Sequence, residues 1–380
     1  MMLLDDNGTL RFHGVPGTTV FNVKEYTEAL SALLRVGKPA ERTDMTKPYE
    51  RFAIRVSQDS SLPGDKICSC LYLPERKQYL YWGKNHCALF LLDEQGSIVK
   101  SADFSRRNFG IPLFEFGNVN PDSMIVINMH QDGLDVFAYN MGSDLLLRLR
   151  AIEPTETHYP SYLLYRLNNR SIAQGLRYSY EDSLTQNAAF PSLWLWDQTM
   201  TGKREVAGYD EATRNNPVRR FFHQAIAQVS NDTIAVAESM SSRIHLYSPA
   251  FTHLGVIECL FDSSTWNYRQ LESIRAINGG PIELYKQLSD SVTRVAETQG
   301  LLFDSIEKKL YVVYEHNTIG DDGLKRPKFV VHLSSVAGSH WEMPQYDKPI
   351  AIHNGVIHCV SSRDGVATLS KYYFNQLTPP

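Results

Sequence analysis

Seven polar residues are the first candidates for chemistry, because they lie in or beside polar segments that follow short apolar runs. They are Asn85, His86, Asn128, His130, Glu238, Glu315 and His316. Carboxylate and amide oxygens are the ligands that calcium prefers, so Glu238, Asn128 and Glu315 are weak candidates for a cation site. A calcium ion bound there could polarise an ester carbonyl, with His130 or His316 as the general base. The chemistry would be calcium-assisted hydrolysis of an ester or lactone.

Each candidate also has a structural interpretation, and no catalytic residue is assigned. Glu238 can accept hydrogen bonds from backbone N–H groups of the loop that follows it. His245, His332 and His358 lie within apolar runs, where histidine is more often a hydrogen-bonded strand residue than a ligand. The sequence contains no G-x-S-x-G elbow, phosphate loop, H-E-x-x-H motif or acidic calcium loop. Its five cysteines include no C-x-x-C pair, which disfavours a zinc site and a disulfide framework.

A repeated pattern of short strands must position the candidate residues. One copy consists of an apolar run at 79–82, a polar loop, a strand at 88–92, the turn DEQG and a strand at 97–101. A second copy between Ile234 and Glu258 has the same order of features. In the DEQG turn, aspartate caps the turn through its backbone and glycine accepts a positive φ. The pattern predicts antiparallel strands joined by tight turns.

Strand starts recur near residues 79, 123, 162, 234, 309 and 355, which gives six units. Units of about 40–50 residues with several strands each are typical of propeller blades. The sequence therefore predicts an all-β fold, a six-bladed β-propeller that forms a single domain over residues 1–380. The third unit is the weakest, because a long loop over 167–191 separates its strands. By analogy with other propellers, the loops that carry the seven candidates would gather around the mouth of the central channel.

Two stretches break the β pattern, and one early strand is expected to close the ring. Residues 22–37 are predicted to form a helix, since Asn22 can cap its start and Gly37 can end it. Residues 266–296 are predicted to form a helical or irregular insertion. An open ring would leave an unpaired edge. We therefore expect a strand within Leu3–Phe12 or Arg51–Val56 to pair with the last blade.

The segment TIAVAESMSSRIHLYSPAFTHLGVIE, residues 233–258, resembles a blade of the NHL-repeat family. The order of features over residues 50–375 is similar to a family of bacterial six-bladed propellers of unknown function. These features are an early YLY strand, Asn108–Ile111, the KLYVVY strand and a final aromatic strand. The resemblance implies a TolB-like propeller with no established activity, and many members of that family are predicted lipoproteins.

Composition limits the partners and leaves the compartment open. The formal charge of −4 comes without a long run of one sign, which argues against a nucleic-acid partner. No apolar stretch approaches the length of a membrane-spanning helix, and no signal peptide is visible. The protein is then periplasmic or at the cell surface if a leader was removed, and cytoplasmic otherwise. Trp194, Trp196 and Trp266 would suit sugar stacking if they are exposed, although packing between blades is the favoured interpretation.

Two functions are consistent with these features. The sequence favours a non-catalytic binding or scaffold propeller that engages a protein or glycan through one face and needs no cofactor. The alternative is a calcium-assisted hydrolase or lactonase at the channel mouth. Carboxylates from different blades within coordination distance would favour the enzyme.

Overall fold

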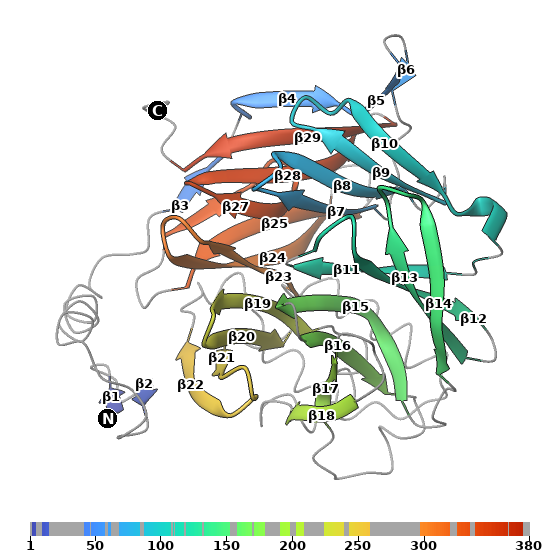
Figure 1. Cartoon of the computed structure of the whole chain (residues 1–380). Coiled ribbons are helices and arrows are strands. Elements are labelled where there is room, and N and C mark those ends of the chain that lie inside the picture. The colour runs from blue at the N-terminus through green and yellow to red at the C-terminus, as the bar shows by residue number, and fades with distance from the viewer. Residues whose placement is uncertain are drawn as a thin grey trace, which may run out of the picture. The chain divides into compact units, whose positions relative to one another are not determined.

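The structure is a computed structural model in which strands dominate (Figure 1). It describes residues 2–4, 10–14, 42–45, 47–57, 60–61, 68–83, 87–107, 109, 111–117, 119–130, 133–152, 158–168, 171–178, 191–197, 203–208, 224–238, 243–258, 297–319, 325–334, 339–363 and 365–374. The only helical segment in these ranges is the 3-10 helix Ser105–Arg107. No helix among them is long and apolar enough to cross a membrane.

The chain divides into two compact units, each built from two pieces of the sequence. Unit 1 consists of Met1–Thr46 and Tyr209–Gln345, and unit 2 of Lys47–Gly208 and Tyr346–Pro380.

Unit 2 contains three large sheets. The first is a four-stranded sheet in the order β10-β9-β8-β7. The second is an eight-stranded sheet in the order β14-β13-β12-β11-β15-β16-β17-β18, and the third is a four-stranded sheet in the order β27-β28-β29-β4. The strands of this unit are β4 (Glu50–Ala53), β5 (Arg55–Ser57), β6 (Ser60–Ser61), β7 (Cys68–Leu73), β8 (Gln78–Gly83), β9 (Ala88–Asp93), β10 (Ile98–Asp103), β11 (Ile111–Gly117), β12 (Met124–His130), β13 (Gly133–Asn140), β14 (Leu145–Ile152), β15 (His158–Asn168), β16 (Ser171–Tyr178), β17 (Pro191–Asp197), β18 (Lys203–Gly208), β27 (Lys348–His353), β28 (Val356–Arg363) and β29 (Val366–Tyr373).

Unit 1 contains two large sheets. One has the order β1-β2-β22-β21-β20-β19, and the other has the order β23-β24-β25-β26-β3. The strands of this unit are β1 (Met2–Leu4), β2 (Leu10–Gly14), β3 (Arg42–Asp44), β19 (Gln224–Ser230), β20 (Thr233–Glu238), β21 (Arg243–Tyr247), β22 (His253–Glu258), β23 (Glu297–Asp304), β24 (Lys309–Ile319), β25 (Lys325–Leu333) and β26 (His340–Glu342). Successive four-stranded antiparallel meanders define an all-β propeller fold.

The number of sheets corrects the sequence-based prediction. Six separate blades were expected, whereas the described strands form five sheets of four or more strands and the small β5–β6 pair. The reason is a parallel ladder between β11 and β15, in which Glu115, Phe116 and Gly117 face Leu164, Tyr165 and Arg166. This ladder joins two successive meanders, β11–β14 and β15–β18, into one eight-stranded sheet. The predicted helical segments 22–37 and 266–296 lie outside the described residues.

The expected closure of the last sheet by an early strand is confirmed. Strand β4 pairs antiparallel with β29, and Figure 1 shows the two strands side by side. The ladder places Arg51 opposite Ser370 and Phe52 opposite Leu369. This strand comes from the second of the two proposed segments, Arg51–Val56. The first proposed segment, Leu3–Phe12, instead contributes to β1 and β2, and β2 pairs with β22.

Hydrophobic cores pack against both faces of the sheet that contains β8 and β9. In unit 2, Leu80, Leu89 and Phe104 pack in one cluster, while Tyr79 and Leu92 pack in another. In unit 1, β24 is buried from Leu310 to Tyr314, which explains its continuous apolar run. The predicted turn after β9 is also confirmed, since Asp93 Oδ1 accepts hydrogen bonds from the backbone N–H groups of Gln95 and Ser97.

Candidate functional site

The residues singled out by the sequence lie on strands of both units or outside the described residues, and their convergence on one site stays a prediction. Asn85 and His86 lie outside the described residues. Asn128 and His130 lie in β12, and Glu238 is the last residue of β20. Glu315 and His316 were expected in a loop, but they lie inside β24, because its pairing with β25 continues to Ile319. Asn128 is buried with 7% exposure, and the side chains of His130, Glu238 and His316 are not described.

No group of three His, Cys, Asp or Glu side chains among the described residues is arranged to hold a metal ion. Two described histidine pairs lie on neighbouring strands. The ring nitrogens of His245 and His253 are 3.3 Å apart, and the ring centroids of His332 and His340 are 6.3 Å apart. Burial, with a smaller contribution from His340, lowers the pKa of His332 to about 4, so its ring is neutral at pH 7.

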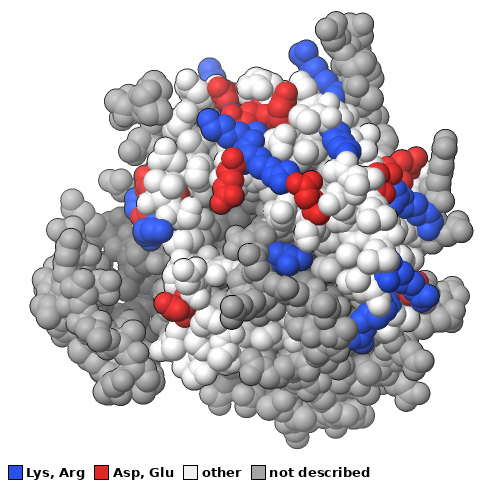
Figure 2. Space-filling view, viewed as in Figure 1, with Lys and Arg blue, Asp and Glu red and all other residues white. Residues whose placement is uncertain are grey.

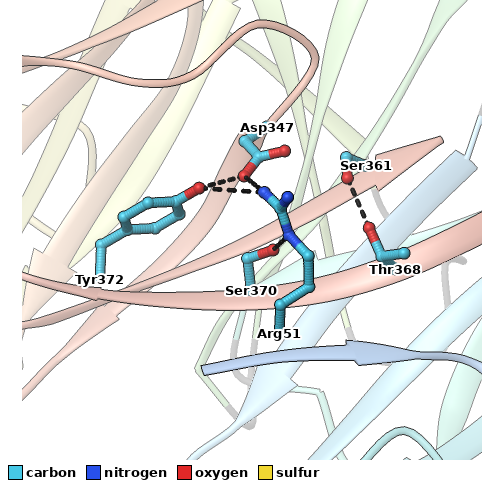
Figure 3. A network of polar contacts seen from close by, with 6 residues as sticks. All are labelled: Arg51, Asp347, Ser361, Thr368, Ser370 and Tyr372. Carbon is cyan, nitrogen blue, oxygen red and sulfur yellow. Dashed lines mark hydrogen bonds and ion pairs between the residues drawn. The ribbon is translucent and has the colours of Figure 1, made fainter. Parts of the chain in front are cut away.

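The most connected polar cluster joins the closing strand β4 to the last sheet. We call Arg51, Asp347, Ser370 and Tyr372 the closure network (Figure 3). Arg51 Nη2 lies 2.6 Å from Asp347 Oδ2, and Arg51 Nε donates to Ser370 Oγ at 3.0 Å. The Tyr372 hydroxyl donates to the same carboxylate oxygen. Beside the network, the hydroxyls of Ser361 and Thr368 share a hydrogen bond of 2.6 Å.

Burial decides what the closure network can do. The Asp347 side chain is 0% exposed and that of Arg51 is 30% exposed. Burial alone would lower the pKa of Arg51. The Asp347 carboxylate and Tyr372 have the larger combined effect, so the pKa is raised and Arg51 stays positively charged. Burial and Asp347 raise the pKa of the Tyr372 phenol, and burial raises the pKa of the nearby Cys359 thiol. With phenol and thiol both protonated, the network contains no activated nucleophile and acts to hold strands together.

A second polar cluster lies on the opposite face of the closing sheet. The Tyr79 hydroxyl and His358 Nδ1 are 2.7 Å apart, and the His358 ring stacks on Tyr72 at 3.9 Å between centroids. The Tyr72 hydroxyl donates to Glu94, and Lys371 lies between the carboxylates of Glu94 and Glu50. Burial, Lys371 and His353 lower the pKa of His358 to about 3, so this histidine is a neutral packing residue. The interpretation of His332 and His358 as strand residues is therefore supported.

The described feature that is hardest to explain by packing is an exposed apolar strand. Six large hydrophobic side chains in the described part are exposed, and three of them lie in β14. These are Leu145, Leu147 and Leu149, at 60%, 57% and 37% exposure, and we call them the edge patch. Figure 1 shows β14 along the outer side of β13, and β14 is the last strand in the order of its sheet. An outer strand normally carries charged residues that discourage association.

The edge patch is held in place by a well-anchored turn between β13 and β14. Asp144 accepts a hydrogen bond from Tyr139 at 3.0 Å and forms an ion pair with Arg107 at 2.6 Å. Asn140 Oδ1 accepts from the backbone N–H of Ser143 at 2.8 Å, and its amide nitrogen donates to the carbonyl of Asp122 at 2.6 Å. The start of β14 is therefore fixed on both sides, and the leucines are presented by a rigid element.

The ladder with β13 determines where the side chains of β14 point. Leu145 and Leu147 lie opposite Asn140 and Ala138, while Leu146 lies opposite Tyr139 and packs against the core. The register shifts between Val136 and Phe137, so Leu149 is an extra residue at a β-bulge. The two charged residues of β14 are arginines. Arg148 pairs with Asp135 at 2.6 Å, and the Arg150 guanidinium lies 5.4 Å from the centre of the Trp196 ring.

Charges elsewhere on the described surface are mixed. Figure 2 shows basic and acidic side chains interspersed on the visible face, without a broad area of one sign. The ion pairs Arg76–Asp122 and Lys371–Glu50 are examples of this mixing. The expected absence of a nucleic-acid partner stays a prediction from composition.

Comparison with known proteins supports the fold. No protein-family model matches the chain, and no curated protein sequence matches it. Its structure is similar to that of a member of the DUF4221 family from Bacteroides vulgatus, with 8% identity, a TM-score of 0.52, and coverage of 86% of this chain and 97% of that one. It is also similar to a candidate exported protein from Bacteroides fragilis, with 9% identity, a TM-score of 0.50, and coverage of 87% and 98%.

At such low identity the likeness establishes the fold alone, and the class of protein is an all-β propeller. The predicted propeller fold is confirmed at this level, and membership of a bacterial propeller family stays a prediction. The NHL-like and TolB-like assignments stay predictions.

Proposed function

We propose that this protein is a non-catalytic binding propeller that engages a protein partner through the edge patch on β14. The observation that supports it is the exposure of Leu145, Leu147 and Leu149 on one anchored outer strand. Large exposed apolar side chains that gather on a rigid surface mark interaction sites more often than isolated ones do. The two described polar clusters contain neutral histidine, protonated phenols and a protonated thiol, which suits a structural role.

A protein partner fits the edge patch better than a glycan. Sugars are commonly bound by exposed aromatic faces together with polar groups, whereas the edge patch is aliphatic. Trp196, one of the tryptophans considered for stacking, is only 1% exposed. Aliphatic side chains are buried favourably against other apolar side chains, and full burial of a leucine contributes about 1.5–3 kcal/mol.

The test is site-specific cross-linking followed by reconstitution. A photo-reactive phenylalanine analogue is introduced at Leu147, and at Ile306 as a control, because Ile306 is equally exposed at 59% but lies in a turn of unit 1. A partner captured at Leu147 and not at Ile306 is then purified, and its Kd is measured with the wild-type protein. Because each leucine is already partly covered, L145S and L147S should each weaken binding about tenfold.

The control variant I306S should leave the Kd unchanged. The proposal is wrong if no adduct is specific to position 147. It is also wrong if the reconstituted partner binds L145S/L147S as tightly as the wild type.

A further inference from the structure

The outer edges of three described sheets are covered by strands from the first part of the same chain. In unit 1, β2 pairs with β22, and β3 pairs with β26. In unit 2, β4 pairs with β29. The outer strand β10 of unit 2 is met at one end by Arg55, whose backbone N–H donates to the carbonyl of Gly96 at 3.0 Å. Addition of an extended segment to an outer strand is therefore the way this fold covers its sheets.

Strand β14 differs from β22, β26 and β29, which the early strands cover. It ends the order of the eight-stranded sheet, and no other strand of the described part pairs with its outer side. Its backbone N–H and C=O groups on that side pair with no strand among the described residues, and they lie next to the exposed side chains of Leu145 and Leu147.

Resting on the function proposed above, we propose that β14 binds its partner by strand addition. The partner contributes an extended segment with apolar side chains at alternate positions and acidic side chains between them. The backbone ladder would run along Leu145–Arg148, because the bulge at Leu149 interrupts regular pairing beyond that point. Alternate side chains of the added strand would then lie beside Leu145 and Leu147.

Charge favours an acidic partner segment over a second copy of this chain. Arg148 and Arg150 are the only charged residues of β14, and the Arg148 side chain is 60% exposed. Acidic side chains on an added strand would be attracted to them, since opposite charges on adjacent strands stabilise pairing. Pairing of β14 with its own copy would instead gather four arginines along one short ladder, where like charges oppose association.

The experiment uses three synthetic peptides of about ten residues, labelled with fluorescein and measured by anisotropy at low salt. The acidic probe alternates valine and glutamate, and the basic probe alternates valine and lysine. The third probe is the acidic peptide with N-methyl groups on alternate backbone nitrogens, which removes the donors of one edge. The full-length protein is used throughout.

We expect the acidic probe to bind at least about fivefold more tightly than the basic probe, and N-methylation to abolish binding. The variant R148E should reverse the preference. K309E is the matched control, because Lys309 is an exposed basic residue of β24 and its replacement should leave the preference unchanged.

Strand addition is refuted if the N-methylated probe binds as well as the acidic probe. It is also refuted if no probe binds at concentrations of about 1 mM. These outcomes are separable from failure of the proposed function. A cross-linked partner that depends on Leu147 but is not displaced by excess acidic probe would keep the edge patch as a binding surface and exclude strand addition.

Discussion

Replacement of Arg51 by methionine tests the energetic role of the closure network. R51M removes the guanidinium but keeps a long apolar side chain. It leaves the Asp347 carboxylate fully buried, with Tyr372 as a hydrogen-bond donor to one oxygen. The second oxygen, Asp347 Oδ1, has no hydrogen-bond partner among the described residues, and Figure 3 shows it pointing away from Arg51.

The magnitude follows from the unequal burial of the two partners. Removal of one partner from a buried ion pair costs about 3–5 kcal/mol. Because Arg51 is 30% exposed, water already screens part of this interaction, and we expect R51M to cost about 3 kcal/mol. D347N should cost about 1–2 kcal/mol. It keeps an acceptor for Arg51 and Tyr372, and it leaves a cation that can reach solvent.

The assay is equilibrium urea unfolding at pH 7, followed by tryptophan fluorescence and circular dichroism, with the slope m compared between variants. K309M is the control, because Lys309 and Glu307 form an exposed ion pair whose loss should cost less than about 1 kcal/mol. Equal losses of unfolding free energy for R51M and D347N would refute the unequal roles of the two charges. A loss for R51M no larger than that for K309M would refute them as well.

Three further predictions follow from other parts of the structure. His332 has a pKa of about 4 in the folded protein and about 6.5 when unfolded, so its contribution to stability is present above pH 6.5 and is lost as the pH falls towards 4. H332F should therefore reduce the pH dependence of the unfolding free energy by about 1.4 kcal/mol per pH unit in that window, and identical slopes would contradict the assignment. Gly96 and Gly365 both have positive φ. A Cβ added at Gly96 would lie 3.0 Å from the Ala53 carbonyl oxygen, whereas a Cβ added at Gly365 would have no atom within 4 Å. G96A should thus be less stable than G365A by about 1 kcal/mol in the same urea assay, and a smaller loss for G96A would contradict the close approach. A chain that begins at residue 54 lacks β1–β4, which leaves β22, β26 and β29 without their pairing strands, so it should form oligomers in light scattering, and a monomer with unchanged thermal stability would refute the closure role of the early strands.

Local features of the fold could be predicted from the sequence, because they depend on residues close together in the chain. The strands β8–β10 and β20–β22 were predicted by their apolar runs, and the Asp93 turn was predicted by its side-chain chemistry. Strand β16 was predicted as part of a loop over 167–191. Its apolar residues are interrupted by Gln174 and Gly175, and it is stabilised by ladders to β15 and β17 on both sides.

The candidate sites could be predicted only in part, because they depend on pairing between distant segments. Arg51 and Ser370 are 319 residues apart, and only the register between β4 and β29 brings them together. The apolar run over residues 145–150, which contains Leu145 and Leu147, is typical of a strand. Its exposure could not be predicted, since a leucine-rich strand is equally suited to a buried position until the order of the sheet is known.

The strands supplied by the first part of the chain have a consequence for biosynthesis. Strands β2, β3 and β4 are synthesised first, but their partners β22, β26 and β29 emerge from the ribosome much later. For most of translation β2, β3 and β4 therefore lack these partners, and the edges through which they pair with the later sheets stay uncovered. Long-range pairing of this kind slows folding and prolongs exposure of strand edges. The nascent chain should therefore depend on chaperones until the last strand, β29, is available to β4.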